Sequence, residues 1–523
     1  MERSESFTNH IREGYSFKGD FITLGSAILD GNPIAGAQVS IPLKTLNRHG
    51  LIAGATGTGK TVTLQIIAEN MAAKGIPVLM MDLKGDLSGI AAAGASNPKI
   101  EERHNAIGIP YQPSGCNIEL LSLSKEKGVR LRATVSEFGP VLFSKILELN
   151  DVQGGIVAIV FKFADDNELP LLDLRDFKRM LQYVTDEGKA AIEKDYGKIS
   201  EASVATILRK VIELETQGAE VFFGEKSFEV GDLIRTDQQG RGVVSIVRLT
   251  DIQDKPKMFS TFMLQMLAEI YNSFPEAGDL EKPKLCVFID EAHLIFSEAS
   301  KALLDQVEAI IKLIRSKGIG IYFCTQNPYD IPEDVLAQLG LKVQHALRAF
   351  TEKDRKAIRK TAENYPISEY YKTEELLTSI GIGQALITAL NEKGIPTPLA
   401  ATHLRAPMSR MGVLTSDEID RVVNSSLLVT RYNEDIDRES AYEILEAKLH
   451  NAKAEKESEE VEVQPKPRSR EKAEKEDPSV IERMSKNTMV RQVGNTVVRE
   501  LARGLLGVLG FGGKTSRRKK SLF

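Results

Sequence analysis

The sequence predicts an α/β protein with a mainly parallel central sheet. Three observations predict it. Residues 54–61 read Gly-Ala-Thr-Gly-Thr-Gly-Lys-Thr and fit the phosphate-binding pattern G-x-x-x-x-G-K-[ST] at every fixed position. An apolar run over 285–289 ends in an acidic pair, and further short apolar runs alternate with segments of helical periodicity. Because parallel sheets bind ligands at the carboxyl ends of their strands, the loop and the acidic pair predict one nucleotide site.

The phosphate loop lies between a predicted strand, 51–53, and a predicted helix, 62–74, in which apolar residues recur at helical spacing. In this arrangement successive backbone N–H groups and the positive end of the helix converge on a phosphate chain. We expect Lys60 to reach the β- and γ-phosphates of ATP and Thr61 to bind Mg²⁺. The residues expected to contact the nucleotide are Gly54, Ala55, Thr56, Gly57, Thr58, Gly59, Lys60, Thr61 and Val62.

The composition predicts a cytoplasmic protein without disulfides. The 523 residues are 42% hydrophobic, with three cysteines, no N-terminal run of signal-peptide type and no long apolar run that could span a membrane. Residues 480–523 hold ten Lys or Arg against two Glu, a local charge of +8; because the net charge is −5, the rest of the chain carries −13. The chain is therefore not a generally basic nucleic-acid binder, and any contact with a polyanion must come from a local patch.

Changes in composition divide the chain into successive segments. Apolar residues at helical spacing fill 142–149, 174–184 and 199–217, which indicates a helical insertion in the core. A later stretch is dense in Glu, Lys and Pro and favours disorder. The predicted order is a cap of short strands (1–48, with strands at 21–24 and 38–41), a core in two parts (49–86 and 241–415), a helical insertion (87–240), polar helices (416–450), a disordered linker (451–478) and a basic, glycine-rich helix with a tail (479–523).

A second core strand, 76–81, ends in the sequence Asp82-Leu83-Lys84-Gly85-Asp86. At the carboxyl end of a parallel strand, Asp82 and Asp86 are placed to order a metal ion or its waters. A plain turn from strand to loop explains the same residues equally well. Both interpretations stay open.

The strand 285–289 ends in Asp290 and Glu291. A carboxylate at the strand tip can accept a hydrogen bond from a Mg²⁺-bound water, so we assign Asp290 to the metal site. Glu291 is placed to orient and deprotonate the attacking water. The alternative, a helix that begins with Asp-Glu, is disfavoured by the apolar strand before it. We expect the positions around 60 and 290 to meet at adjacent strand ends and to hold one triphosphate with its magnesium.

Two more strands are predicted beyond the acidic pair. The strand 320–325 ends at Gln326, whose amide can sense the γ-phosphate or cap the next turn. Residues 383–388 predict the last strand of the core.

Two arginines follow in the region of a further predicted strand, 342–350. Arg348 lies in that strand and Arg355 in the capped helix after it. One of them is a candidate to stabilise the transition state in a neighbouring subunit, an effect worth about 10³ to 10⁵ in rate. A surface arginine is the simpler explanation for each taken singly.

The segment 489–509 places apolar residues at helical spacing, interleaves them with glycines, and precedes a basic run at 517–520. Small residues permit close helix packing, and the basic end suits an anionic lipid surface or nucleic acid. A helix that docks on another subunit, followed by a solubilising tail, explains the pattern as well.

The sequence Asp-Glu-Ala-His at 290–293 spells a motif of helicases that have two successive ATPase cores. Those enzymes have a much shorter interval between loop and acidic pair, whereas 230 residues separate Lys60 from Asp290 and one core is visible. One core with a large insertion, a strand-end Gln and candidate arginines suggests a ring motor whose sites form between subunits.

The sequence resembles the HerA/FtsK group, and within it the HerA-like bacterial ATPases of the YjgR type. The resemblance covers roughly residues 20–415. It rests on four motifs, which are RHGLIAGATGTGKT at 48–61, DLKGDLSG at 82–89, FIDEAH at 288–293 and VQHALRAFT at 343–351.

This resemblance implies a RecA-like core, ATP hydrolysis with Mg²⁺, a homo-oligomeric ring that is a hexamer, and translocation along double-stranded DNA. It assigns the roles given above to Lys60, Thr61, Asp290, Glu291 and Gln326 and makes Arg348 the preferred arginine finger. Archaeal HerA proteins have an N-terminal β-barrel that docks a nuclease. The segment 1–48 is too short for a complete barrel, so no nuclease partner is expected.

Two functions remain. The first is a ring-forming ATPase that converts hydrolysis into movement on DNA; its DNA substrate rests on the resemblance, since a fold does not determine a substrate. The second is a nucleotide-dependent assembly or secretion ATPase that acts on polypeptide at a membrane, which it contacts through the C-terminal segment. The acidic charge of the rest of the chain favours the second function, and the family resemblance opposes it.

Overall fold

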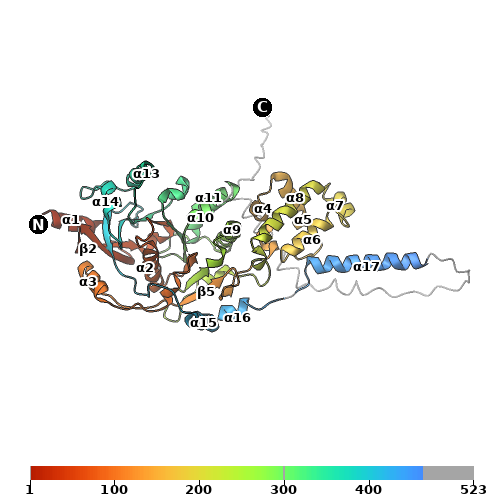
Figure 1. Ribbon diagram of the computed structural model, residues 1–523, viewed down its shortest axis with the longest axis horizontal. Coiled ribbons are helices and arrows are strands. Elements are labelled where there is room, and N and C mark those ends of the chain that lie inside the picture. Colours follow the sequence, from red (N-terminus) through yellow and green to blue (C-terminus); the bar gives the residue numbers. More distant parts are fainter. Residues whose placement is uncertain (1, 298–300, 437, 463–523) are drawn as a thin grey trace, which may run out of the picture. The chain divides into compact units, whose positions relative to one another are not determined.

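The computed structural model describes residues 2–297, 301–436 and 438–462 (Figure 1). The chain divides into two compact units, one made of Met1–Arg132 with Lys226–Glu434 and the other of Ala133–Glu225 with the chain from Asp435. The helix and tail predicted over 479–523 lie outside the described residues. Within the described ranges, no helix is long and apolar enough to cross a membrane.

The first unit is built on a single sheet, which confirms the predicted α/β fold. Its strands in the described residues are β1 (Phe21–Leu29), β2 (Asn32–Pro42), β3 (Gly50–Ala53), β4 (Val78–Asp82), β5 (Ile118–Ser122), β6 (Val129–Arg130), β7 (Val244–Arg248), β8 (Leu285–Ile289), β9 (Ile319–Thr325), β10 (Leu341–Gln344), β11 (Gln384–Thr388) and β12 (Ala400–Leu404). They run in the order β2-β1-β12-β11-β10-β3-β9-β8-β4-β7-β5-β6. The pairs from β10 to β6 are parallel, and those from β2 to β10 are antiparallel.

Helices connect the strands of the first unit and make up most of the second. The first unit contains α1 (Glu2–Gly14), α2 (Lys60–Ala73), α3 (Pro98–Ile107), α9 (Pro256–Ser273), α10 (His293–Ser297), α11 (Lys301–Ile314), α12 (Glu333–Leu336), α13 (Glu352–Glu363), α14 (Thr373–Ser379), α15 (Ser416–Ser425) and α16 (Leu427–Tyr432). The second contains α4 (Val135–Ile146), α5 (Asp151–Asp166), α6 (Leu174–Tyr183), α7 (Lys189–Asp195), α8 (Glu201–Thr216) and α17 (Ala441–Glu462).

Helix α2 is held against the sheet by the apolar residues that its sequence pattern predicts. Leu64, Ile67 and Met71 are fully buried and share one cluster with Ile52 of β3 and Cys324 of β9. Burying each such side chain contributes about 1.5–3 kcal/mol relative to exposure. This packing keeps the N-terminus of α2 at the carboxyl end of β3.

The N-terminal residues lengthen the sheet instead of capping it. The strands predicted at 21–24 and 38–41 are parts of β1 and β2, and β1 pairs with β12. Helix α1 precedes them and buries Phe7 and Ile11. The sequence pattern did not predict this helix, because its remaining residues are mostly polar.

Two strand predictions at the other end of the core need correction. The strand predicted over 342–350 ends at Gln344. Beyond it, the carbonyl of Ala346 accepts a hydrogen bond from the N–H of Ala55 in the phosphate loop and not from a neighbouring strand. Residues 384–388 form β11, but β11 is not the last strand: β12 follows and lies between β11 and β1. The sequence of β12 is Ala-Ala-Thr-His-Leu, and alanine has little strand preference.

The helical part of the chain is smaller than the insertion predicted over 87–240. It begins at Ala133 and ends at Glu225, because β5 and β6 before it belong to the sheet of the first unit. The helices predicted at 142–149, 174–184 and 199–217 overlap α4, α6 and α8.

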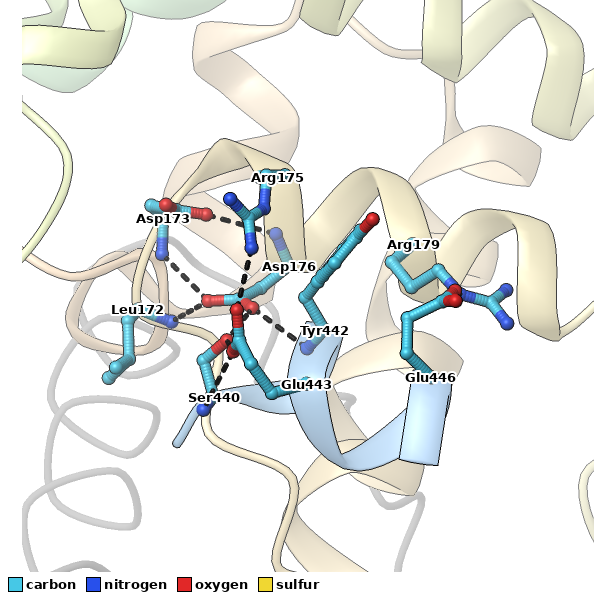
Figure 2. A network of polar contacts seen from close by, with 9 residues as sticks. All are labelled: Leu172, Asp173, Arg175, Asp176, Arg179, Ser440, Tyr442, Glu443 and Glu446. Carbon is cyan, nitrogen blue, oxygen red and sulfur yellow. Dashed lines mark hydrogen bonds and ion pairs between the residues drawn. The ribbon is translucent and has the colours of Figure 1, made fainter. Parts of the chain in front are cut away.

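Helix α17 packs on α6 within the second unit, and a buried carboxylate joins the two (Figure 2). Asp176 of α6 is 1% exposed and accepts hydrogen bonds from the hydroxyl of Ser440 and, at 3.0 Å, from the N–H of Tyr442. Arg179 donates from Nε to Glu446 at 2.9 Å. Because the first N–H groups of a helix have no partner within it, Asp176 helps to cap α17.

This docked helix corrects the linker prediction. We expected disorder from residue 451, but α17 continues to Glu462. The remainder of the predicted linker lies outside the described residues.

Candidate active site

The phosphate loop connects β3 to α2, as predicted. Gly54, Gly57 and Gly59 have φ angles of 154°, 77° and 109°. A Cβ atom at position 54 would lie 2.5 Å from Cβ of His345, so glycine alone fits there. The loop ends at the first turn of α2, whose initial N–H groups have no partner within the helix and suit an anion.

Lys60 is buried at the start of α2, with 6% exposure. Its Nζ donates a hydrogen bond to the carbonyl of Ala55 at 3.2 Å. Burial lowers the pKa of Lys60, and Cys324, Glu291 and Asp290 offset part of this effect. A buried ammonium that has lost its water is stabilised by an anion, so the position of Lys60 fits a phosphate.

The acidic pair lies two strands away from the loop, not at the adjacent strand end that we expected. β9 lies between β3 and β8, with Ala53 opposite Thr325 and Ile289 opposite Phe323. Neighbouring strands are about 4.8 Å apart, so the two strand ends are about 10 Å from each other. Burial lowers the pKa of Lys60 and both carboxylates raise it in part, so the acidic pair lies close enough to the loop to act on its lysine.

Asp290 is 1% exposed at the end of β8, and its Oδ2 has no hydrogen-bond partner among the described residues. Burial raises the pKa of Asp290, while Lys84 and the thiol of Cys324 act in the opposite direction. A buried carboxylate oxygen without a partner costs free energy. A hard cation or a water bound to it would satisfy this oxygen.

Glu291 has a strained backbone. Its φ is 47°, a left-handed conformation that costs a non-glycine residue roughly 1–2 kcal/mol. Its carboxylate forms an ion pair with Nζ of Lys84 and lies 3.2 Å from Nδ1 of His293. Strain of this kind persists where the surrounding structure imposes it, and it is concentrated at functional sites.

The residues present fit Mg²⁺. Among the described residues, no group of three or more His, Cys, Asp or Glu could hold a metal ion. Mg²⁺ in nucleotide sites takes one or two protein oxygens and completes its shell with water and phosphate oxygens. Thr61, in the first turn of α2, and Asp290 offer two such oxygens, whereas a zinc or calcium cage is not supported.

Asp82 is a turn residue. Its Oδ1 accepts from the N–H groups of Gly85 at 2.7 Å and Asp86 at 3.2 Å, and its Oδ2 accepts from Leu87 at 3.2 Å. Burial raises the pKa of Asp82 to about 6. Of the two interpretations left open, the structure supports the turn for Asp82. Asp86 has a buried Oδ1 without a hydrogen-bond partner among the described residues, so either interpretation still fits it.

Gln326 follows β9, between the loop and the acidic pair. Its Oε1 accepts a hydrogen bond from the hydroxyl of Thr56 at 3.2 Å, which places the amide against the phosphate loop. The next turn is capped by Asn327, whose side chain accepts from the N–H of Tyr329. The capping role that we considered for Gln326 therefore belongs to Asn327.

Arg348 and Arg355 are both exposed. Arg348 lies in the loop after β10, outside the strand in which we placed it, and Arg355 lies in the first turn of α13. Within the described residues, neither guanidinium forms a hydrogen bond or ion pair with the phosphate loop. β10 is the parallel neighbour of β3, so both arginines follow a strand that ends beside the loop.

Two residues of the site were not among the predicted ones. His345 is fully buried beneath Gly54, and its Nε2 lies 2.9 Å from the hydroxyl of Thr63 in α2. Burial lowers the pKa of His345 to about 4, so the ring is neutral near pH 7. Lys84 reaches Glu291 from the turn after β4. Its place at the carboxyl end of a core strand was the sequence signal that could have identified it.

A phosphate loop at the end of β3, an acidic pair at the end of β8 and a glutamine at the end of the strand between them define a P-loop ATPase. The chain belongs to the HerA_C family, described as "Helicase HerA-like C-terminal", whose sequence profile matches residues 28–517. The resemblance seen in the motifs is confirmed.

Among its relatives, the chain is 23% identical over 386 residues to the "DNA double-strand break repair helicase HerA" of Sulfolobus acidocaldarius, which covers 71% of this chain and 68% of that protein. It is 25% identical over 358 residues to the "DNA import protein CedB" of the same organism, covering 68% of this chain and 52% of CedB. The chain thus spans about two thirds of the HerA protein and half of CedB.

The chain also aligns with two solved structures. The "Plasmid coupling protein TrwB in complex with the non-hydrolisable ATP-analogue ADPNP" aligns with a TM-score of 0.49 and 15% identity, over 76% of this chain and 100% of that one. VirB4 of Thermoanaerobacter pseudethanolicus aligns with a TM-score of 0.46 and 15% identity, over 75% of this chain and 98% of that one.

Proposed function

We propose that the protein is an ATP-hydrolysing ring motor that moves along double-stranded DNA. The observation that carries the proposal is the order of three neighbouring strand ends in the sheet. Lys60 lies after β3, Gln326 follows β9, and Asp290 and Glu291 follow β8. The proposal of DNA as the substrate is supported by relatives that are named as a DNA repair helicase and a DNA import protein.

In this proposal the loop and Lys60 bind the phosphates of ATP. The backbone N–H groups of the loop and of the first turn of α2 surround the phosphate chain, and the buried ammonium of Lys60 pairs with the β- and γ-phosphates. Thr61 and Asp290 would hold Mg²⁺, which supplies positive charge to the phosphate oxygens.

Hydrolysis then depends on Glu291. Its carboxylate orients a water and accepts a proton as the water oxygen bonds to the γ-phosphorus. The bond from that phosphorus to the bridging oxygen breaks, and ADP and phosphate result. Gln326, already in contact with Thr56 of the loop, is placed to detect whether the γ-phosphate is present.

The two exposed arginines support a site completed by a second subunit. We propose Arg348 as the group that stabilises the transition-state charge in the neighbouring site, with Arg355 as the alternative. A ring is the closed arrangement that gives each subunit the same head-to-tail contact.

Mixing Arg348→Ala subunits with Glu291→Gln subunits is expected to restore ATPase activity that neither variant has alone. In a one-to-one mixture, about a quarter of the interfaces combine an intact Glu291 with an intact Arg348 from the neighbour. The measurement is turnover against mixing ratio, with Arg355→Ala mixed in the same way as the comparison. If the mixture is no more active than its components, Arg348 does not act in the neighbouring site.

ATP turnover is expected to rise when double-stranded DNA is added, and the stimulation is expected to fall steeply between about 50 and 200 mM salt, because DNA contacts release counterions. The measurement is turnover at several DNA and salt concentrations. A protein without its nucleotide site, Lys60→Ala, should show no turnover with or without DNA.

The alternative is an ATPase that acts on polypeptide at a membrane, which the charge of −13 outside residues 480–523 favours. Two results together would favour this alternative over the DNA motor. ATP turnover would not change when DNA is added, and liposome binding would disappear when residues 480–523 are deleted.

A further inference from the structure

A second ammonium lies in the site besides that of Lys60. Lys84 is carried by the turn after β4, which is the parallel neighbour of β8. The turn is held by the buried carboxylate of Asp82, which accepts from three consecutive N–H groups, and by Gly85 with a φ of 77°. The backbone of Lys84 is therefore fixed at the same edge of the sheet as the acidic pair.

The side chain of Lys84 ends at the carboxylate proposed to activate water. Its Nζ forms an ion pair with Oε1 of Glu291. Nδ1 of His293 lies 3.2 Å from Oε2 of Glu291. Among the described residues, neither oxygen of Glu291 forms a hydrogen bond with any other group. In this structure, the general base is therefore occupied by a cation.

Lys84 shares its electrostatic surroundings with Lys60 and the acidic pair. Burial alone lowers the pKa of Lys84, but the ion pair with Glu291 and the charge of Asp290 outweigh burial and leave the pKa raised. Its own charge also acts on Lys60, which is the residue expected to reach that phosphate. An anion that is bound by Lys60 therefore lies within the electrostatic reach of Lys84.

We propose that Lys84 is a positioning residue that holds Glu291 in the absence of ATP and transfers to the γ-phosphate when ATP binds. This inference rests on the proposed ATPase function and adds a trigger to it. With ADP no γ-phosphate is present, and Lys84 stays on Glu291. With ATP, Glu291 is released to hold the attacking water.

The side chain of Lys84 can exchange Glu291 for a phosphate as its partner. Lys84 is 41% exposed, and a partly hydrated ion pair is weak enough to be exchanged. Its flexible four-carbon stem allows Nζ to move while the backbone stays in the turn held by Asp82. The γ-phosphate carries more negative charge than one carboxylate, so it competes effectively for the ammonium.

The test compares the affinities of ADP and of a non-hydrolysable ATP analogue in four proteins: wild type, Lys84→Met, Glu291→Gln and the double variant. We expect Lys84→Met to keep the wild-type affinity for ADP and to bind the ATP analogue about tenfold more weakly or worse. Glu291→Gln frees Lys84 for the phosphate and should bind the ATP analogue more tightly than wild type. The double variant should lose this gain.

Two further proteins serve as comparisons. Lys84→Arg keeps the positive charge and should restore most of the preference for the ATP analogue over ADP. Lys312 is a matched control, because it is 40% exposed and pairs with Asp334 at 3.1 Å away from the site. Lys312→Met should leave both affinities unchanged.

A Lys84→Met protein with the wild-type ratio of the two affinities would overturn the inference, as would a double variant that keeps the gain of Glu291→Gln. A parallel loss of ADP affinity would also overturn it, because Lys84 would then support the whole site. Lys60→Ala separates this inference from the proposed function. If Lys60→Ala loses ATP while Lys84→Met behaves as wild type, only the role of Lys84 is wrong.

Discussion

The Lys60→Ala variant is expected to bind ATP at least about 10²-fold more weakly than the wild-type protein. A hydrogen bond to a charged group contributes about 1.5–3 kcal/mol, and Lys60 is proposed to make such bonds to two phosphates. Their joint loss of about 3–6 kcal/mol corresponds to roughly 10² to 10⁴ in the dissociation constant. The measurement is an equilibrium titration with a fluorescent ATP analogue.

The control for this variant is Lys74→Ala at the other end of the same helix. Lys74 follows α2 and pairs with Asp20 at 3.5 Å on the surface. Its removal should change neither the fold nor ATP affinity. If Lys60→Ala binds ATP as tightly as wild type, the phosphates do not lie where we place them.

The Glu291→Gln variant is expected to bind ATP and to hydrolyse it about 10² to 10⁴ times more slowly than wild type, the range typical of general-base catalysis. Glutamine has nearly the same shape as glutamate but cannot accept the proton of the attacking water. The measurement is single-turnover hydrolysis with saturating enzyme, which separates the chemical step from product release.

The binding titration provides the control within the same variant. ATP affinity at or above the wild-type value shows that the site is intact, so a slow chemical step can be assigned to the missing base. Near-normal turnover in Glu291→Gln would mean that another group activates the water. A slow chemical step in Glu291→Gln could come from loss of the base or from loss of the ion pair with Lys84. Lys84→Met separates the two causes, because it removes the cation and keeps the base.

The chemistry of the site was readable from short patterns. Residues 54–61 and the pair Asp290 and Glu291 are defined by neighbours along the chain, and the structure places both at the carboxyl ends of strands in the same sheet. The helical pattern after the loop likewise identified α2 and its buried face. Local patterns suffice here because a strand, a turn and the start of a helix are formed by consecutive residues.

Elements that depend on partners far away in the sequence were harder to predict. β12 and α1 have weak local patterns, and each is stabilised by packing against distant parts of the first unit. The docking of α17 on α6 uses Asp176, which also belongs to the capping box at the start of α6, so its distant partner is not visible in the local sequence. Tertiary contacts override weak local preferences in such segments.

Short motifs and periodicity were enough to predict a phosphate loop and an acidic pair on a mainly parallel sheet. Three features appear only in the folded chain: β9 separates the two strands, His345 lies against Gly54, and Lys84 pairs with Glu291. Strand order and contacts between distant side chains follow from packing the whole chain, which a local pattern does not record.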